Sequence, residues 1–269
     1  GLRAQADLVM GEVARNAVTI LFPDPATQTE PLPPPFQVDD NILIFSDSRL
    51  VRECADCTAE AAIGPDEVAN IIKRLYGAEA TGQIDPDRVT SLTFVDLNMF
   101  LDSQRKAANE RGSAQTGPIT PSVSISPTVA ITLPAMLTTF DLEALVTSVP
   151  AALFQDRNAK TAGVIEGADW IIFAMLDVNP ERYPNSDAVA RFLREYGDEL
   201  ADQKLVVLAL NAPYFLDATE MSRLTTYLGV YSKTQPFLES AVRALFSAYT
   251  PVGAPPVDVP GTRFSSLAS

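Results

Sequence analysis

The chain has 269 residues, of which 46% are hydrophobic, and it carries a net charge of −14. This composition is that of a globular protein whose core is large enough to be stable without disulfides or metals. The negative charge would repel nucleic acid and anionic membranes. No apolar run reaches about 18 residues, so we expect no membrane span. The sequence contains no histidine, which excludes Ser-His-Asp and Cys-His catalytic sites and His-ligated metals. We therefore expect no metal, and any acid–base chemistry would fall to carboxylates, Lys, Tyr or Cys.

The first half of the chain alternates between predicted helices and strands. Apolar residues recur at three- and four-residue spacing over residues 2–17, which predicts a helix, and its uncapped start leads us to expect further residues before Gly1. The apolar run at 42–45 is typical of a strand buried on both faces. The other expected elements of this half are strands at 17–22 and 89–94, helices at 65–76 and from an Asp96 cap to about 105, and a Pro-rich surface connection at 23–37.

The second half continues this alternation after an irregular segment at 106–135, in which Ser, Thr, Gly and Pro dominate. Strands that alternate with helices indicate a doubly wound, mainly parallel sheet, an α/β sandwich with helices on both faces. We therefore expect a single α/β domain over residues 1–269. The elements expected in this half are helices at 140–154, 187–200, 218–224 and 236–246, strands at 170–175 and 205–210, an apolar stretch at 227–231 and a Pro-rich tail at 251–269.

Several segments match motifs of a known family. They are residues 14–21 (ARNAVTIL), 205–214 (LVVLALNAPY), Tyr231 followed by 241–246 (AVRALF), and the tail 251–260 (PVGAPPVDVP). They resemble the C-terminal α/β sandwich domain of glycoside hydrolase family 3, loosely over the whole chain and most specifically in the last helix and tail. Ser247 and Pro255 depart from the family pattern, which usually has Gly and Leu there. Residues 46–135 are less typical and look closer to the β-N-acetylhexosaminidase-like branch than to the β-glucosidases.

The resemblance implies a non-catalytic domain that packs on an N-terminal catalytic barrel of the same protein and meets a carbohydrate substrate through that barrel. In the family the nucleophilic Asp lies on the barrel, near a Lys-His-Phe-type motif that a chain without histidine cannot contain. The acid/base group lies on the barrel in the hexosaminidase-like branch and on this domain in the β-glucosidase branch, and the resemblance leaves that choice open. We expect no cofactor.

Two alternatives to an accessory domain stay open. One is a free-standing module of doubly wound fold that binds a sugar or another small ligand, and the other is an independent enzyme that uses carboxylates. A large exposed apolar patch would favour the accessory domain. A deep polar pocket at the strand ends would favour the binding module.

Acidic residues cluster in the loop after the expected strand at 42–45. Glycoside hydrolysis uses two carboxyl groups that flank the scissile bond, and ligands of doubly wound folds bind beyond the C-terminal ends of the strands. Asp47 and Glu53, with Asp56 nearby, are therefore the catalytic candidates within this chain. Because the chain has 34 acidic residues, a solvated acidic loop is the alternative interpretation.

Cys54 and Cys57 form a Cys-x-x-Cys pair. A thioredoxin-type pair opens a helix directly after a strand, whereas this pair lies well past the strand and no helical pattern follows it. Two cysteines without histidine also make an incomplete zinc site. We interpret the pair as a local disulfide or as free thiols.

Three expected strand ends are rich in polar and aromatic side chains, at 46–49, 177–185 and 211–217. Because parallel strands end at the same edge of a sheet, we expect this edge to face the barrel and border the substrate cleft. Arg49 and Tyr214 are the expected contacts, since Arg and Tyr are frequent in interface hot spots. Arg182, Tyr183 and Asn211 are expected beside them. Alternatively, these loops are polar only because they are solvated.

Overall fold

The computed structural model describes residues 2–28, 33–52, 54–114 and 151–265. Its centre is a six-stranded sheet in the order β1-β8-β7-β6-β2-β5. All neighbouring strands run parallel except β1, which pairs antiparallel with β8 at one edge. The expected doubly wound, mainly parallel sheet is confirmed. The strands are β1 (Thr19–Phe22), β2 (Ile42–Ser46), β5 (Val89–Thr93), β6 (Trp170–Met175), β7 (Lys204–Ala209) and β8 (Thr226–Gly229).

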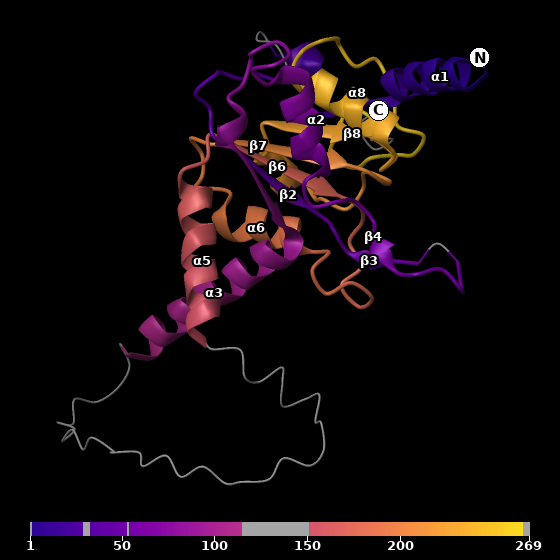
Figure 1. Cartoon of the computed structure of the whole chain (residues 1–269). Helices are drawn as coiled ribbons and strands as arrows, with labels where there is room; N and C mark the ends of the chain where they lie inside the picture. Colours follow the sequence, from indigo (N-terminus) through magenta and orange to yellow (C-terminus); the bar gives the residue numbers. More distant parts are fainter. Residues whose placement is uncertain (1, 29–32, 53, 115–150, 266–269) are drawn as a thin grey trace, which may run out of the picture.

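Helices cover both faces of the sheet (Figure 1). α2 (Glu67–Tyr76) and α8 (Gln235–Leu245) cover one face, and α3 (Phe94–Ala114), α5 (Ala151–Glu166) and α6 (Ala188–Tyr196) cover the other. α1 (Leu2–Ala17) packs on α8, and the short α7 (Ala218–Ser222) packs on α6. A small hairpin of β3 (Leu50–Val51) and β4 (Glu60–Ala61) and two 3₁₀ turns, Pro25–Thr27 and Pro86–Arg88, complete the described elements. None of the helices in these ranges is long and apolar enough to cross a membrane.

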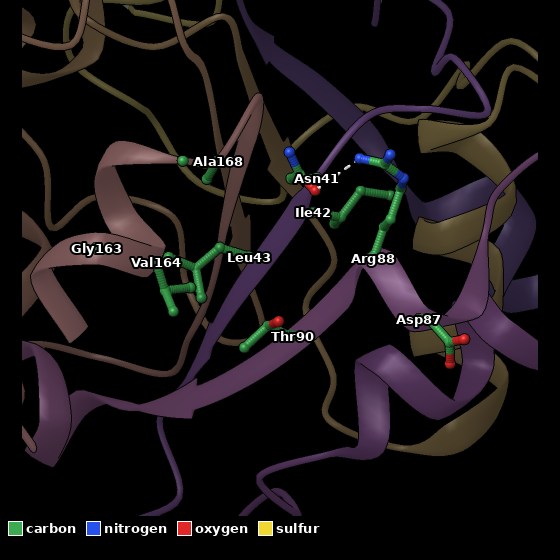
Figure 2. Close-up of a pocket in the computed structure, with 10 residues that line it drawn as sticks. Asn41, Ile42, Leu43, Asp87, Arg88, Thr90, Gly163, Val164 and Ala168 are labelled. Atoms are coloured by element: carbon green, nitrogen blue, oxygen red, sulfur yellow. Dashed lines mark hydrogen bonds between the residues drawn. The ribbon is translucent and has the colours of Figure 1, made fainter. Parts of the chain in front are cut away.

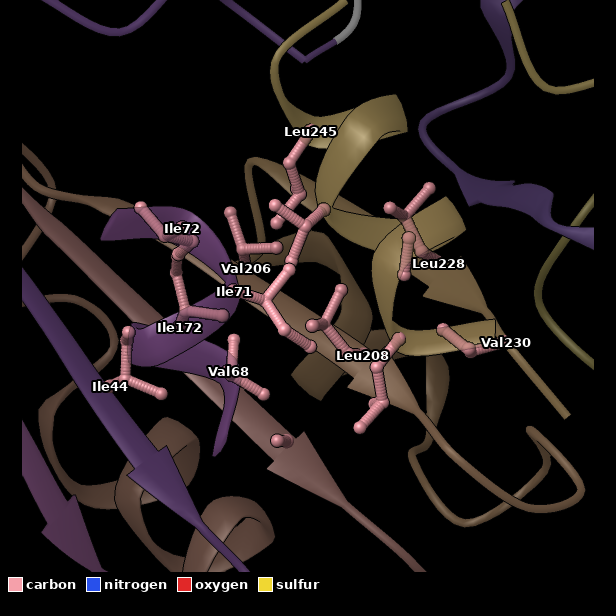
Figure 3. Packing of buried hydrophobic residues seen from close by; sticks show 14 of the residues in the cluster. Ile44, Val68, Ile71, Ile72, Ile172, Val206, Leu208, Leu228, Val230 and Leu245 are labelled. Atoms are coloured by element: carbon pink, nitrogen blue, oxygen red, sulfur yellow. The ribbon is translucent and has the colours of Figure 1, made fainter. Parts of the chain in front are cut away.

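Each face of the sheet has its own hydrophobic core, because successive side chains of a strand point to opposite faces. In β2, for example, Ile44 belongs to the core under α2 and α8, and Phe45 belongs to the core under α3, α5 and α6. Figure 3 shows the first of these cores, in which aliphatic side chains from the parallel strands pack against Ile71 of α2 and Leu245 of α8. Burial on both faces explains why these strands are continuous apolar runs in the sequence.

The start of α3 differs from the expectation that Asp96 caps it. The helix begins at Phe94, and Thr93 is the capping residue. The Thr93 backbone N–H and hydroxyl donate to Asp96 Oδ2 at 2.9 and 2.7 Å, and the Asp96 N–H donates to Thr93 Oγ1 at 3.3 Å. This is a reciprocal capping box, in which an acidic residue in the first turn satisfies the N–H of the cap.

The irregular segment expected at 106–135 is wrong for residues 106–114, which continue α3. The rest of that segment lies outside the described residues, and so does the expected helix at 140–154 up to residue 150. The chain is described again from Ala151, where α5 begins, and this helix continues to Glu166, beyond the expected end at residue 154.

The Pro-rich connection at 23–37 is not only a surface segment, because Phe36 at its end is buried in the core. Its ring stacks between Trp170 and Phe246, with ring centres 3.9 and 4.3 Å apart, and Phe246 stacks in turn on Tyr76 at 3.9 Å. Four aromatic rings thus join this connection to β6, α2 and the end of α8. Aromatic stacking at such distances stabilises a core beyond the area that it buries.

The Pro-rich tail returns to the beginning of the chain. The Gly253 N–H donates to the Val18 carbonyl at 3.2 Å. A Cβ at position 253 would lie 2.3 Å from the Ala17 carbonyl oxygen, so only glycine fits this crossing. Two motifs that are far apart in the sequence, 14–21 and 251–260, are therefore in direct contact.

Candidate functional site

The C-terminal edge of the sheet carries a buried ion cluster centred on Arg49. Arg49 Nε donates to Asp47 Oδ1 at 2.8 Å, and Nη2 donates to the Asp177 carbonyl oxygen at 2.7 Å. Arg49 also forms ion pairs with the second oxygen of Asp47 and with Asp177 Oδ1. Asp47 directly follows β2 and Asp177 follows β6, and these strands are neighbours in the sheet. The cluster therefore ties the two loops together.

Burial governs the electrostatics of this cluster. Asp47 is 2% exposed and the Arg49 side chain 8%. Burial raises the pKa of the Asp47 carboxyl above its ordinary value, and the hydrogen bonds and charge of Arg49 offset only part of that rise. Burial alone would lower the pKa of the Arg49 guanidinium, but its contacts with Asp47 and Asp177 raise it above its ordinary value. Burial thus disfavours the charged forms of Asp47 and Arg49, and the opposite charges in the cluster stabilise them.

These contacts bear on the catalytic candidates. Both carboxylate oxygens of Asp47 face Arg49, so neither is free to attack a sugar or to transfer a proton. Asp56 is exposed, and Glu53 lies outside the described residues. No group of three or more His, Cys, Asp or Glu side chains in the described ranges could hold a metal ion.

Arg49 has a different role from the expected partner contact. Because its guanidinium is enclosed by two carboxylates, it is not available to an exterior surface. It also lies over the Tyr183 ring, 4.4 Å from the ring centre. Arg182 stacks on the same ring at 5.2 Å. The structure thus brings together Asp47, Arg49, Arg182 and Tyr183 from two loops that the sequence singled out separately.

Asp177 is the member that the sequence analysis did not single out, although it lies in the range 177–185. The sequence could have indicated it only by its position, because Asp47 and Asp177 each follow the end of a buried strand. That shared position brings the two carboxylates together only because β2 and β6 are neighbours in the sheet.

Asn211 and Tyr214 lie in the loop after β7, the next strand along the same edge. Both are exposed, with Tyr214 at 52%. The Tyr214 ring lies 4.7 Å from that of Phe215. In the described part of the chain, neither side chain is hydrogen-bonded to the Arg49 cluster. These two residues are therefore free to meet a partner, whereas Arg49 is not.

The hairpin of β3 and β4 forms an exposed arm that leaves the sheet directly after the Arg49 cluster. At its base, the Ala62 N–H donates to the Arg49 carbonyl at 2.8 Å. Near its tip, Cys54 and Cys57 are joined in a disulfide. Both cysteines are exposed. The pair therefore closes a short surface loop and does not open a helix as a thioredoxin-type pair does.

We predict that thiol counting in denaturant without reductant finds no free thiol in this chain. The double change Cys54→Ser, Cys57→Ser should lower the free energy of unfolding by about 2 kcal/mol or less, because the bond closes a very short loop. Denaturant titration of the variant beside the wild type measures this. The reduced wild type, which should show two thiols, is the control. Rapid reduction of insulin by the chain would contradict a structural role.

α1 carries an exposed apolar surface, made of Val9, Met10 and Val13 on one side of the helix and Leu8 on another. Leu8, Val9, Met10 and Val13 are 76%, 54%, 43% and 50% exposed, whereas Ala14 is buried against the domain. β1 is antiparallel, and its first residue, Thr19, pairs with Gly229 at the end of β8. The junction of α1 and β1 therefore lies at the C-terminal edge of the parallel strands, and Figure 1 shows α1 reaching beyond the body of the domain.

An open hollow of about 340 Å³ lies at the opposite edge, where β2 and β5 begin. Leu43, Thr90 and Val164 line it beside Arg88 (Figure 2). Arg88 Nη1 donates to Asn41 Oδ1 at 3.1 Å, so part of the rim is already paired within the chain. Ligands of doubly wound folds bind at the other edge, and this hollow is not the deep pocket at the strand ends that would favour a free-standing binding module.

No family model matches the chain, and no curated protein matches it. Solved structures do. A fungal multi-domain glycoside hydrolase family 3 β-N-acetylglucosaminidase matches at 17% identity and a TM-score of 0.46, over 97% of this chain and 20% of that one. A family 3 β-N-acetylglucosaminidase from Paenibacillus sp. matches at 11% identity and a TM-score of 0.47, over 94% of this chain and 32% of that one. These two belong to the family that the sequence motifs resemble. β-Glucosidase 3B from Thermotoga neapolitana matches at 13% identity and a TM-score of 0.44, over 97% of this chain and 32% of that one. The chain thus spans between a fifth and a third of these proteins.

Proposed function

We propose that this chain is the C-terminal α/β domain of a family 3 glycoside hydrolase. It acts as a non-catalytic domain of that enzyme. It packs on the catalytic barrel of the same protein with the C-terminal edge of its sheet, and the loops at that edge border the carbohydrate cleft.

The observation that carries the proposal is the apolar surface of α1 at that edge. Leu8, Val9, Met10 and Val13 are exposed on one helix. Exposed groups of large apolar side chains mark protein contacts, because water contact with them is unfavourable. α1 joins β1 at the C-terminal edge of the sheet, where the loop of Tyr214 also lies. We therefore place the partner contact and the expected cleft loops on one side of the domain.

The positions of the family motifs support the assignment to family 3. The Gly of the tail motif, Gly253, lies where the backbone crossing leaves no room for a side chain. The Asn-x-Pro-Tyr turn, 211–214, follows β7 at the C-terminal edge. The helix and strand that open the family domain are α1 and β1. These three motifs thus have defined places in this fold, and for Gly253 the structure gives the reason for the residue type.

The geometry of the described acidic residues supports a non-catalytic role for the isolated chain. Glycoside hydrolysis needs two carboxyl groups that can reach the scissile bond from either side. At the edge where a site would form, Asp47 and Asp177 both hold Arg49. Both hold their loops in place, and Asp47, with both oxygens on Arg49, is not available to a substrate.

We predict that the double change Val9→Asp, Val13→Asp lowers kcat/KM of the enzyme that contains this domain by about ten-fold or more, because two charges are placed in an apolar contact. Thermal unfolding of the domain itself should be unchanged, since both positions are exposed in it. Val38→Asp, an exposed valine away from α1, is the matched control. Kinetics with N-acetylglucosaminide and glucoside chromogens, with and without the barrel, measure the effect.

Two outcomes would contradict the proposal. One is turnover by the isolated chain that disappears when Asp47 is replaced. The other is unchanged kinetics and an unchanged domain contact in the α1 double variant.

A further inference from the structure

We propose that Arg182 recognises the carboxylate of an acidic sugar at the C-terminal edge of the sheet. This inference rests on the proposed function and deepens it, because it names the class of carbohydrate that the edge receives. Arg182 lies in the loop between β6 and α6 and is exposed. Its guanidinium carbon lies 5.2 Å from the centre of the Tyr183 ring. Within the described residues, no carboxylate forms an ion pair with it.

The loop that carries Arg182 is held in place from several sides. The Arg182 N–H donates to Asn179 Oδ1 at 3.2 Å, and the Tyr183 N–H donates to the Asn179 carbonyl at 2.8 Å. The Asn179 N–H donates in turn to the hydroxyl of buried Ser186 at 2.8 Å. The Arg49 guanidinium stacks on the Tyr183 ring and holds that ring against the buried ion cluster. A guanidinium on such a support loses less conformational entropy when it binds than one on a free side chain.

The charges around Arg182 favour a carboxylate over a phosphate. A guanidinium binds either group through two parallel N–H donors. However, Glu181 is exposed next to Arg182. Its carboxylate repels a doubly charged phosphate more strongly than a singly charged carboxylate.

The neighbouring loop supplies partners for a sugar. Asn211 and Tyr214 follow the adjacent strand β7 and are exposed. In the described part of the chain, neither the Asn211 amide nor the Tyr214 hydroxyl is hydrogen-bonded to another residue. An amide and a phenol together donate to and accept from sugar hydroxyls. A ligand that combines a carboxylate with several hydroxyls, such as a uronic acid, fits this combination.

The test is an NMR titration of the isotopically labelled chain with glucuronate, glucose and acetate in parallel. We expect glucuronate to bind about ten-fold more tightly than either of the others and to shift the Arg182 and Tyr183 signals, because it alone offers both the charge and the hydroxyls. Arg182→Gln should abolish this preference. Arg15→Gln is the matched control, since Arg15 also stacks on a tyrosine, at 4.9 Å from the Tyr249 ring, but lies on α1. Unchanged thermal unfolding shows that each variant is folded.

Several results would overturn the inference. Equal binding of glucose and glucuronate would show that the carboxylate of the sugar is not recognised. Equal binding of acetate and glucuronate would show a site for simple anions. A loss of the preference in Arg15→Gln as large as in Arg182→Gln would show non-specific attraction. The titration needs no barrel, so it can fail while the domain contact through α1 holds, and the reverse is equally distinguishable.

Discussion

Replacing Arg49 with methionine should lower the free energy of unfolding of this domain by about 3–5 kcal/mol at neutral pH. Methionine keeps much of the aliphatic length but removes the charge and all the donors. Asp47, 2% exposed, is then left as a buried carboxylate without its partner. A buried pair is strongly destabilised when one member is lost, because the remaining charge has neither water nor a counter-ion. Urea titration of variant and wild type measures the difference.

The same prediction can be tested by how the stability loss in Arg49→Met depends on pH. Burial already raises the pKa of Asp47, and removing Arg49 should raise it further. A carboxyl whose folded-state pKa is raised binds its proton more tightly in the folded state. The loss in the variant should therefore be largest above that pKa and should shrink as the pH falls towards about 4, the ordinary value for aspartate.

Arg105→Met is the matched control for Arg49→Met. Arg105 pairs with Asp102 at 3.1 Å, and both side chains are largely exposed. Exposed pairs of this kind contribute roughly 0.5 kcal/mol. Equal effects of the two changes, or a loss in Arg49→Met that grows as the pH falls, would contradict a buried cluster.

Phe36→Ala should also lower the free energy of unfolding by about 3–5 kcal/mol. Phe36 belongs to the Pro-rich connection, but its ring fills the space between Trp170 and Phe246. Truncation removes the buried ring and leaves a cavity between two aromatic faces that cannot fully close. Denaturant titration, with the single tryptophan as fluorescence probe, measures the effect.

Two further variants define this prediction. Phe36→Leu should lose only about 1–2 kcal/mol, because most of the volume stays and only the stacking is lost. Val38→Ala, at an exposed position in the adjacent turn, should lose roughly 0.5 kcal/mol or less. A loss below about 1 kcal/mol in Phe36→Ala would show that the connection lies outside the core.

The sequence alone determined the strands of the main sheet and their alternation with helices, but it predicted neither most of α5 nor the hairpin of β3 and β4. Runs such as Ile42–Phe45 and Trp170–Met175 predict their strands because both faces of each strand are covered, so every position is apolar. Local chemistry was also readable. Asp217, directly before the helix expected at 218–224, caps α7, and such capping involves residues only three apart. The start of α3 was misread by three residues for the same local reason, because Thr93 and Asp96 share one capping box.

Only the tertiary structure decided how these elements meet. Arg49 was expected to contact a partner, but strand order places β2 beside β6 and brings Asp177 to it from 128 residues away. The periodicity of residues 2–17 predicted α1, but a helical pattern cannot tell whether its apolar face meets this domain or another protein. Val9, Met10 and Val13 are exposed here, because α1 packs on α8 and only Ala14, on another side of the helix, is buried among residues 4–16. Strand order and helix orientation depend on contacts between distant residues, and no local pattern in the sequence encodes them.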